Sequence, residues 1–125
     1  MKQTDRIQQQ RIVDHWTLSN GLPIAGERLP YLRSVTVGVW LRVGSVLESP
    51  EENGLSHFLE HMVFKGTARY TARAISEAMD AVGGQLDAFT SKDHTCFYAK
   101  VIDEDLPLAL DILSELTMGA LMAQE

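Results

Sequence analysis

Alternating hydrophobic and polar positions run through the first part of the chain and predict β-strands. Residues 12–18 alternate roughly in this way, and the Asn20-Gly21 pair that follows suits a two-residue hairpin turn. Residues 22–27 are the expected return strand of this β-hairpin. Further on, residues 34–43 are rich in β-branched side chains, which predicts a central strand that ends at Gly44-Ser45.

Two segments in the middle of the chain have the apolar spacing of an α-helix. Residues 54–65 carry such a face after a polar loop, with Asn53 as the expected N-cap. A second helix is expected over residues 72–82, with Thr71 as its N-cap. Each of these helices therefore has a start signal as well as a hydrophobic face.

The last third of the chain predicts two more strands and a final helix. The strands are residues 85–90 and 94–102, and the turn residues 91–93 join them. Asp103 or Asp105 is expected to cap the helix, which begins near Leu106.

This order of elements predicts one α+β domain with a mainly antiparallel sheet and packed helices. The domain is expected over residues 11–125, where a hydrophobic content of 45% is enough for a real core. Residues 1–10 have no useful periodicity and are expected to be a flexible lead-in.

Charge and cysteine content narrow the function classes. A net charge of -6 argues against nucleic acid as a general partner, because phosphates need a basic face. The single cysteine, Cys96, cannot form an internal disulfide and is expected to be a buried strand residue. No apolar segment resembles a secretory signal or a membrane span, which predicts a soluble, cytoplasmic protein with no membrane partner.

The first predicted helix carries the pattern His57-Phe58-Leu59-Glu60-His61. Residues four apart share one face of a helix, so His57 and His61 can direct both imidazoles at one metal ion. Zinc lowers the pKa of a bound water from about 16 toward about 7, and Glu60 lies where a carboxylate can take the water's proton. This is the inverted form, H-x-x-E-H, of a metallopeptidase helix. The alternative is a surface helix whose polar side chains are simply solvated.

The residues around this pattern form a long, ordered series of short segments between about residues 11 and 116. They are 18–21 (LSNG), 37–40 (VGVW), 44–45 (GS), 54–62 (GLSHFLEHM), 64–67 (FKGT), 83–84 (GG), 88–90 (AFT) and 95–98 (TCFY). Together they resemble the M16 family of zinc peptidases, which includes the insulinase-type and mitochondrial-processing-type enzymes.

The resemblance implies roles for individual residues. His57 and His61 would be zinc ligands, and Glu60 would be the general base. The strand after the Gly-Gly pair would bind extended peptide by strand addition, which makes Asp87, Ala88 and Phe89 the expected substrate-binding residues. Asp87 stands where the family more often has Asn, so a side-chain amide contact is not expected there.

A third zinc ligand is not supplied by this motif, although catalytic zinc normally has three protein ligands. The resemblance implies a glutamate roughly 75 residues beyond His61, near position 137, on a later helix. The chain is therefore expected to be the amino-terminal part of a peptidase domain, incomplete or inactive alone. Local residues that offer a donor atom are Glu77, Asp80, Asp87, Asp93, His94 and Glu115.

The predicted function is that of a zinc-dependent metalloendopeptidase, acting on a peptide substrate beside a second M16-like domain or subunit. The alternative is a non-catalytic, structural or peptide-holding subunit of the same fold. A more distant alternative is a simple two-histidine metal-binding module.

Overall fold

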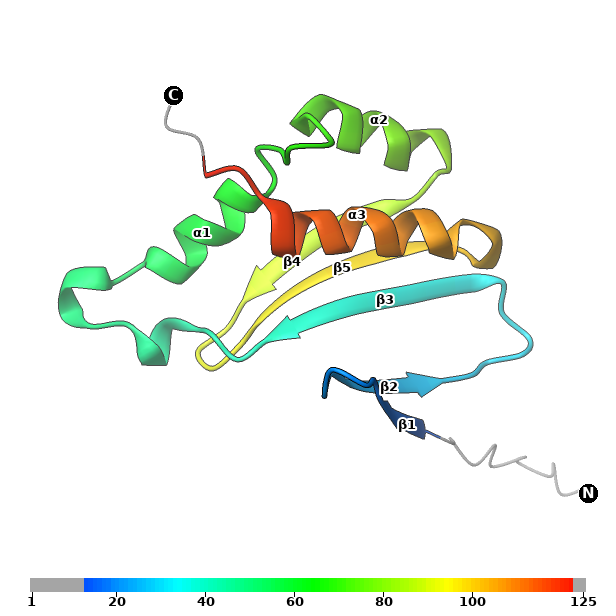
Figure 1. Ribbon diagram of the computed structural model, residues 1–125, viewed down its shortest axis with the longest axis horizontal. Helices are drawn as coiled ribbons and strands as arrows, with labels where there is room; N and C mark the ends of the chain where they lie inside the picture. The colour runs from blue at the N-terminus through cyan, green and yellow to red at the C-terminus, as the bar shows by residue number, and fades with distance from the viewer. Residues whose placement is uncertain (1–12, 123–125) are drawn as a thin grey trace, which may run out of the picture. The chain divides into compact units, whose positions relative to one another are not determined.

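The computed structural model describes residues 13–122, and the chain divides into two compact units between Leu32 and Arg33 (Figure 1). The expected flexible lead-in, residues 1–10, lies outside the described residues. The first unit contains the predicted hairpin, in which β1 (Val13–Thr17) pairs antiparallel with β2 (Pro23–Glu27).

The connection in this hairpin is longer than the expected two-residue turn. The Leu18 N–H donates to the Leu22 carbonyl at 2.9 Å, which leaves residues 19–21 as the loop. Gly21 has a φ of 88°, the left-handed conformation that commonly ends a three-residue hairpin loop. The Asn-Gly pair thus marks the turn correctly, but Gly21 closes the loop and does not form half of a two-residue turn.

The second unit is built on a three-stranded antiparallel sheet with the order β3-β5-β4. The strands are β3 (Ser34–Leu41), β4 (Gln85–Thr90) and β5 (Thr95–Ile102). The prediction that residues 34–43 form the central strand is wrong among the described strands, because β5 pairs with β3 on one side and β4 on the other. The α+β class and the antiparallel pairing are as expected.

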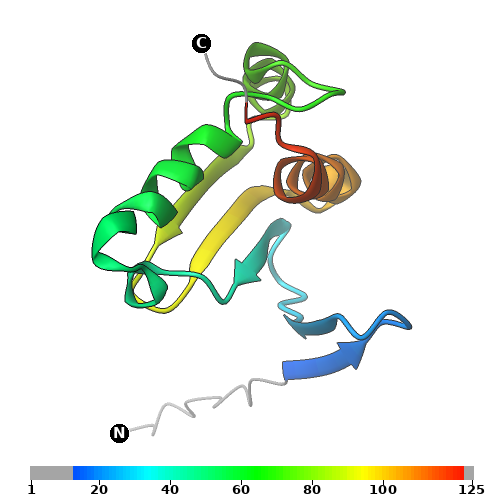
Figure 2. The same ribbon diagram turned by 60° about the vertical axis from the view of Figure 1, so that its left-hand side comes forward.

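Three α-helices, α1 (Leu55–Val63), α2 (Ala72–Ala81) and α3 (Leu106–Gly119), lie on one face of this sheet (Figure 2). The inward face of β5 contributes Phe97, Ala99 and Val101 to a core shared with all three helices. Ile112, Leu113 and Leu116 of α3 are at most 1% exposed, so α3 forms the centre of this core. Cys96 is also buried, as expected from its position in a strand.

Short 3-10 turns replace three stretches expected to be loop or helix start. They are Ser45–Leu47, Pro50–Glu52 and Asp103–Asp105. Asp105 does precede α3, as expected, although its side chain makes no capping hydrogen bond. Thr71 caps α2 as predicted, because its hydroxyl oxygen accepts a hydrogen bond from the Ala74 N–H.

Candidate metal centre

The N-cap of helix α1 is Gly54, one residue later than the predicted cap Asn53. Asn53 ends the preceding 3-10 turn, and Gly54 takes the N-cap position with a φ of 90° that favours glycine. The Glu48 carboxylate supplies the missing cap, since it accepts hydrogen bonds from the Gly54 and Ser56 N–H groups, each at 2.7 Å. Hydrogen bonds from Ser56 and Gly54 lower the pKa of Glu48 below its ordinary value. An acid from outside the helix therefore fixes the start of the motif-bearing turn.

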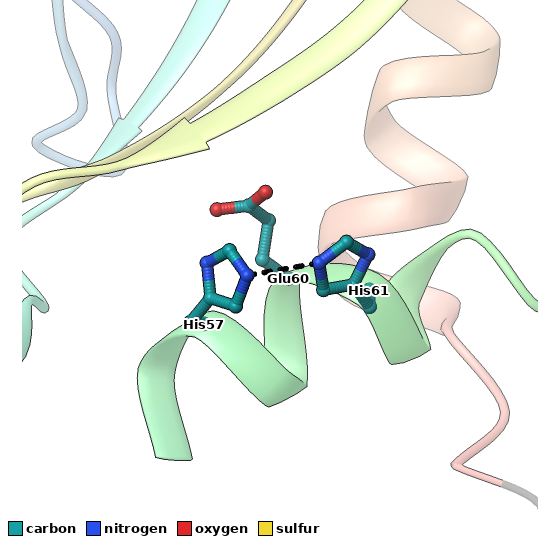
Figure 3. A group of neighbouring side chains, drawn as sticks. All are labelled: His57, Glu60 and His61. Carbon is teal, nitrogen blue, oxygen red and sulfur yellow. Dashed lines mark hydrogen bonds between the residues drawn. The ribbon is translucent and has the colours of Figure 1, made fainter. Parts of the chain in front are cut away.

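His57 and His61 lie one turn apart and meet at their ring edges (Figure 3). Their Nε2 atoms are 3.0 Å apart, and the two ring planes are inclined by 78°. Glu60 offers a carboxylate oxygen to the same group, in which the three ligand atoms all lie within 4.8 Å of one another. Both histidines are exposed, whereas Glu60 is only 9% exposed.

The two imidazole nitrogens fit the requirements of zinc. Two ring nitrogens approach to 3.0 Å only across a shared hydrogen or a shared cation. A tetrahedral zinc ion bound at about 2.0–2.1 Å to each nitrogen separates the two by about 3.3 Å, which needs only a small adjustment. His57 and His61 would therefore hold the ion, and imidazole and carboxylate are both donors that zinc accepts.

The Glu60 side chain extends from α1 toward the sheet and reaches the end of β4. The Thr90 hydroxyl donates a hydrogen bond to Oε2 of Glu60. In Figure 3 the Glu60 carboxylate points from the helix toward the strands, while the imidazoles of His57 and His61 lie on either side of its stem. One carboxylate oxygen is thus engaged by the sheet, and Oε1 has no such bond from Thr90.

Most of the alternative donor residues are engaged elsewhere. Glu77 pairs with Arg73 at 2.6 Å, and Glu115 pairs with Arg69 at 3.0 Å. Hydrogen bonds from Ser91 and His94 hold the pKa of Asp93 below its ordinary value. Within residues 13–122, His57, Glu60 and His61 make up the one group of three or more such donors close enough for a metal ion. Asp80 and Asp87 are not part of it.

The expected peptide-binding residues lie on β4, whose second edge has no partner among the described strands (Figure 1). The Ser91 N–H donates to the His94 carbonyl at 2.8 Å, so Ser91 and His94 form a hydrogen-bonded pair. Along an antiparallel ladder such pairs alternate with pairs whose backbone groups point away from each other. Asp87 and Phe89 therefore direct their backbone groups at β5, and Ala88 directs its own at the open edge. The Ala88 N–H is covered there by Oδ1 of Asp87 at 2.8 Å.

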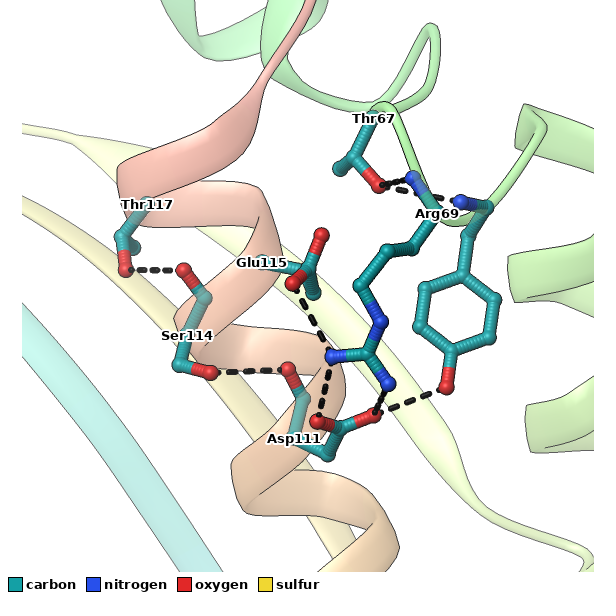
Figure 4. Close-up of polar contacts among 7 residues, drawn as sticks. Thr67, Arg69, Asp111, Ser114, Glu115 and Thr117 are labelled. Carbon is teal, nitrogen blue, oxygen red and sulfur yellow. Dashed lines mark hydrogen bonds and ion pairs between the residues drawn. The ribbon is translucent and has the colours of Figure 1, made fainter.

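A polar cluster that the sequence did not predict ties the segment after α1 to α3 (Figure 4). Arg69 donates to Asp111 at 2.9 and 3.3 Å and to Glu115 at 3.0 Å, and the Tyr70 hydroxyl donates to Asp111 at 2.7 Å. Hydrogen bonds from Tyr70 and Arg69 lower the pKa of Asp111. These partners are at least 41 residues apart in the chain, so no local pattern signals them.

Comparison with known proteins gives one consistent result. The model of the insulinase family, peptidase family M16, matches residues 24–125. A zinc protease of Streptomyces coelicolor is 51% identical over 109 residues, which cover 87% of this chain and 24% of the relative. The zinc protease YmxG of Bacillus subtilis is 52% identical over 105 residues, which cover 84% of this chain and 26% of the relative.

A mitochondrial protein and a solved structure give the same result. The mitochondrial-processing peptidase subunit beta of Lentinula edodes is 46% identical over 104 residues, 83% of this chain and 22% of that subunit. The crystal structure of a protease from Helicobacter pylori matches with a TM-score of 0.85 at 28% identity, over 92% of this chain and 28% of that one. The chain spans about a quarter of the length of the curated relatives it matches. Among its described helices, none has the length and apolar character needed to cross a bilayer.

Proposed function

The chain belongs to the insulinase family of zinc peptidases, M16, and we propose that it supplies the zinc-binding helix and the general base of a metalloendopeptidase. The observation that carries this proposal is the approach of His57 Nε2 and His61 Nε2 to 3.0 Å, with the Glu60 carboxylate in the same group. A cytoplasmic location is part of the same proposal.

The reaction is hydrolysis of a peptide bond. His57 and His61 would hold the zinc ion, whose Lewis acidity would lower the pKa of water toward about 7. Glu60 accepts the proton of the attacking water at its carboxylate, and Oε1 is the oxygen not engaged by Thr90. Glu60 then returns this proton to the departing amine nitrogen as the carbon–nitrogen bond breaks, so the base is regenerated in each cycle.

The peptide substrate would be held on the open edge of β4. The Ala88 carbonyl points to this edge, where the Ala88 N–H is covered by Asp87 Oδ1, and strand addition holds a peptide with little dependence on its sequence. The same strand ends at Thr90, which contacts Glu60, so a peptide aligned on β4 is led toward the base. Asp87 and Phe89 direct their backbone groups at β5, so their part in binding would come from their side chains.

Two parts of the site are proposed to come from outside the described residues. A third zinc ligand is needed, because the donor group within residues 13–122 contains two histidines and a carboxylate assigned here as the base. A second M16-like domain or subunit would close the chamber around the peptide. Since the chain covers about a quarter of its relatives, both parts belong to the proposal for the longer protein.

The second candidate function is a non-catalytic, peptide-holding subunit of the same fold. It keeps the two-histidine metal site and the edge of β4 that has no partner among the described strands, and it needs no further ligand. It predicts that metal binds at His57 and His61 but that no peptide is hydrolysed.

One set of variants separates these functions. Zinc content and cleavage of a fluorogenic peptide are measured for the longer protein that supplies the third ligand and the second domain, as wild type, Glu60→Gln and His57→Ala. The enzyme proposal expects Glu60→Gln to retain zinc and to lose hydrolysis by at least about 100-fold, the scale of general-base catalysis, and expects His57→Ala to lose the metal. Hydrolysis at the wild-type rate in Glu60→Gln removes the proposed base. Zinc binding without hydrolysis in the wild type supports the peptide-holding function.

A further inference from the structure

Beside a metal held by the two histidines, the Glu60 carboxylate could act either as a third ligand or as a base. Its ligand atom lies within 4.8 Å of both imidazole donors, and carboxylate oxygen is an ordinary ligand of zinc. A carboxylate that binds the metal directly is no longer available to take a proton. Something outside α1 must therefore set the direction of this side chain.

The Thr90 hydroxyl is placed to do this. It donates to Oε2 of Glu60 from the last residue of β4, on the face of the sheet that carries the helices. Its neighbour Thr95, only 5% exposed, directs its own hydroxyl hydrogen to the Val43 carbonyl at 2.8 Å. Thr95 Oγ1 lies 3.5 Å from Thr90 Oγ1, a poor distance for a bond, which leaves the Thr90 hydrogen for Glu60.

The strand end that carries Thr90 is itself fixed in place. The Val46 N–H donates to the Lys92 carbonyl at 2.8 Å, and the Ser45 N–H donates to the Ser91 carbonyl at 3.3 Å. At Gly44 a Cβ atom would lie 2.6 Å from the Lys92 backbone, so the two segments pack with no room between them. Thr90 therefore holds Glu60 from a rigid support and not from a loose loop.

We propose that Thr90 is a positioning residue, which anchors Glu60 to the sheet so that its carboxylate acts as the base and does not become a metal ligand. This inference rests on the proposed function, because it assumes that His57 and His61 bind a metal. A residue outside the H-x-x-E-H motif then decides whether Glu60 is a metal ligand or a base.

Cobalt(II) provides the test, because its visible absorption reports the number and type of ligands without any need for hydrolysis. The full 125-residue chain is titrated with cobalt(II) as wild type, Thr90→Val, Thr90→Ser and the double variant Thr90→Val/Glu60→Gln. Valine preserves the branched shape without a hydroxyl. We expect Thr90→Val to bind cobalt about tenfold more tightly with an altered spectrum, because the released Glu60 carboxylate becomes an additional ligand.

The control variants assign the effect to Glu60. Thr90→Ser keeps the hydroxyl and should retain the wild-type spectrum and affinity, and the double variant should return to them because the freed carboxylate is gone. A folded Thr90→Val variant with an unchanged spectrum overturns the proposal.

The single variant Glu60→Gln keeps the test decisive if Thr90→Val does not fold. We expect its cobalt spectrum to match that of the wild type, because Glu60 is not a ligand while Thr90 holds it. A spectrum that changes in Glu60→Gln overturns the role of Thr90 alone. Failure of the wild type to bind cobalt through His57 and His61 overturns the proposed function instead.

Discussion

Leu116 and Leu110 lie on the same helix, α3, but differ in what surrounds them. Leu116 is 0% exposed in the core, whereas Leu110 is 48% exposed. Truncation of a fully buried leucine to alanine removes its transfer free energy and leaves a cavity, at a cost of about 3 kcal/mol in the free energy of unfolding. For Leu110→Ala the loss is about 1 kcal/mol or less, because half of the side chain already contacts solvent and no closed cavity forms.

Thermal unfolding followed by circular dichroism measures this difference. In a domain of this size 1 kcal/mol corresponds to about 4–8 °C in Tm, so Leu116→Ala should lower Tm by more than about 10 °C. Leu110→Ala is the matched control, with the same substitution in the same helix, and should lower Tm by less than about 8 °C. Equal shifts for the two variants would refute the packing of α3 on β5 described above.

Three further predictions concern the support of the site. The pKa of Glu48 is lowered in the folded state, so its capping of α1 stabilises the fold above pH 4.5, its ordinary pKa, and this stabilisation is lost as the pH falls through the folded pKa. Glu48→Gln should therefore reduce the pH dependence of the free energy of unfolding in this range. Thr71→Ala removes the N-cap of α2 and should cost about 1 kcal/mol in urea unfolding, with Thr71→Ser as the neutral control. Gly44→Ala places a Cβ 2.6 Å from the Lys92 backbone, so it should change the amide NMR shifts of residues 90–95, and unchanged shifts would contradict that contact.

Local patterns were sufficient for the elements of the fold. The ranges 85–90 and 72–82 were predicted almost to the residue, because alternation and capping depend only on neighbours in the sequence. The predicted cap Asn53 was wrong because of another local interaction. Ser49 and Glu52 form a capping box for the preceding 3-10 turn, which moves the N-cap of α1 to Gly54.

Contacts between distant segments were not predictable in this way. Spacing within one helix places His57 and His61 together, because residues four apart share a face whatever the rest of the chain does. The direction of Glu60 depends instead on Thr90, 30 residues later, and the attachment of the next segment depends on Arg69 and Asp111, 42 residues apart. A single sequence contains no periodic signal for such pairs.

The H-x-x-E-H motif does not by itself decide the role of its glutamate. The H-x-x-E-H spacing is enough to bring two imidazoles to one metal ion, but it leaves the carboxylate within reach of the same ion. Whether that carboxylate is a base or a ligand depends on the hydrogen-bond donor that it meets on the sheet, which in this chain is the Thr90 hydroxyl. The chemistry attributed to the helix is therefore a property of the helix and β4 together. A chain with the same motif but an apolar residue at the position of Thr90 should bind metal well and hydrolyse peptides poorly.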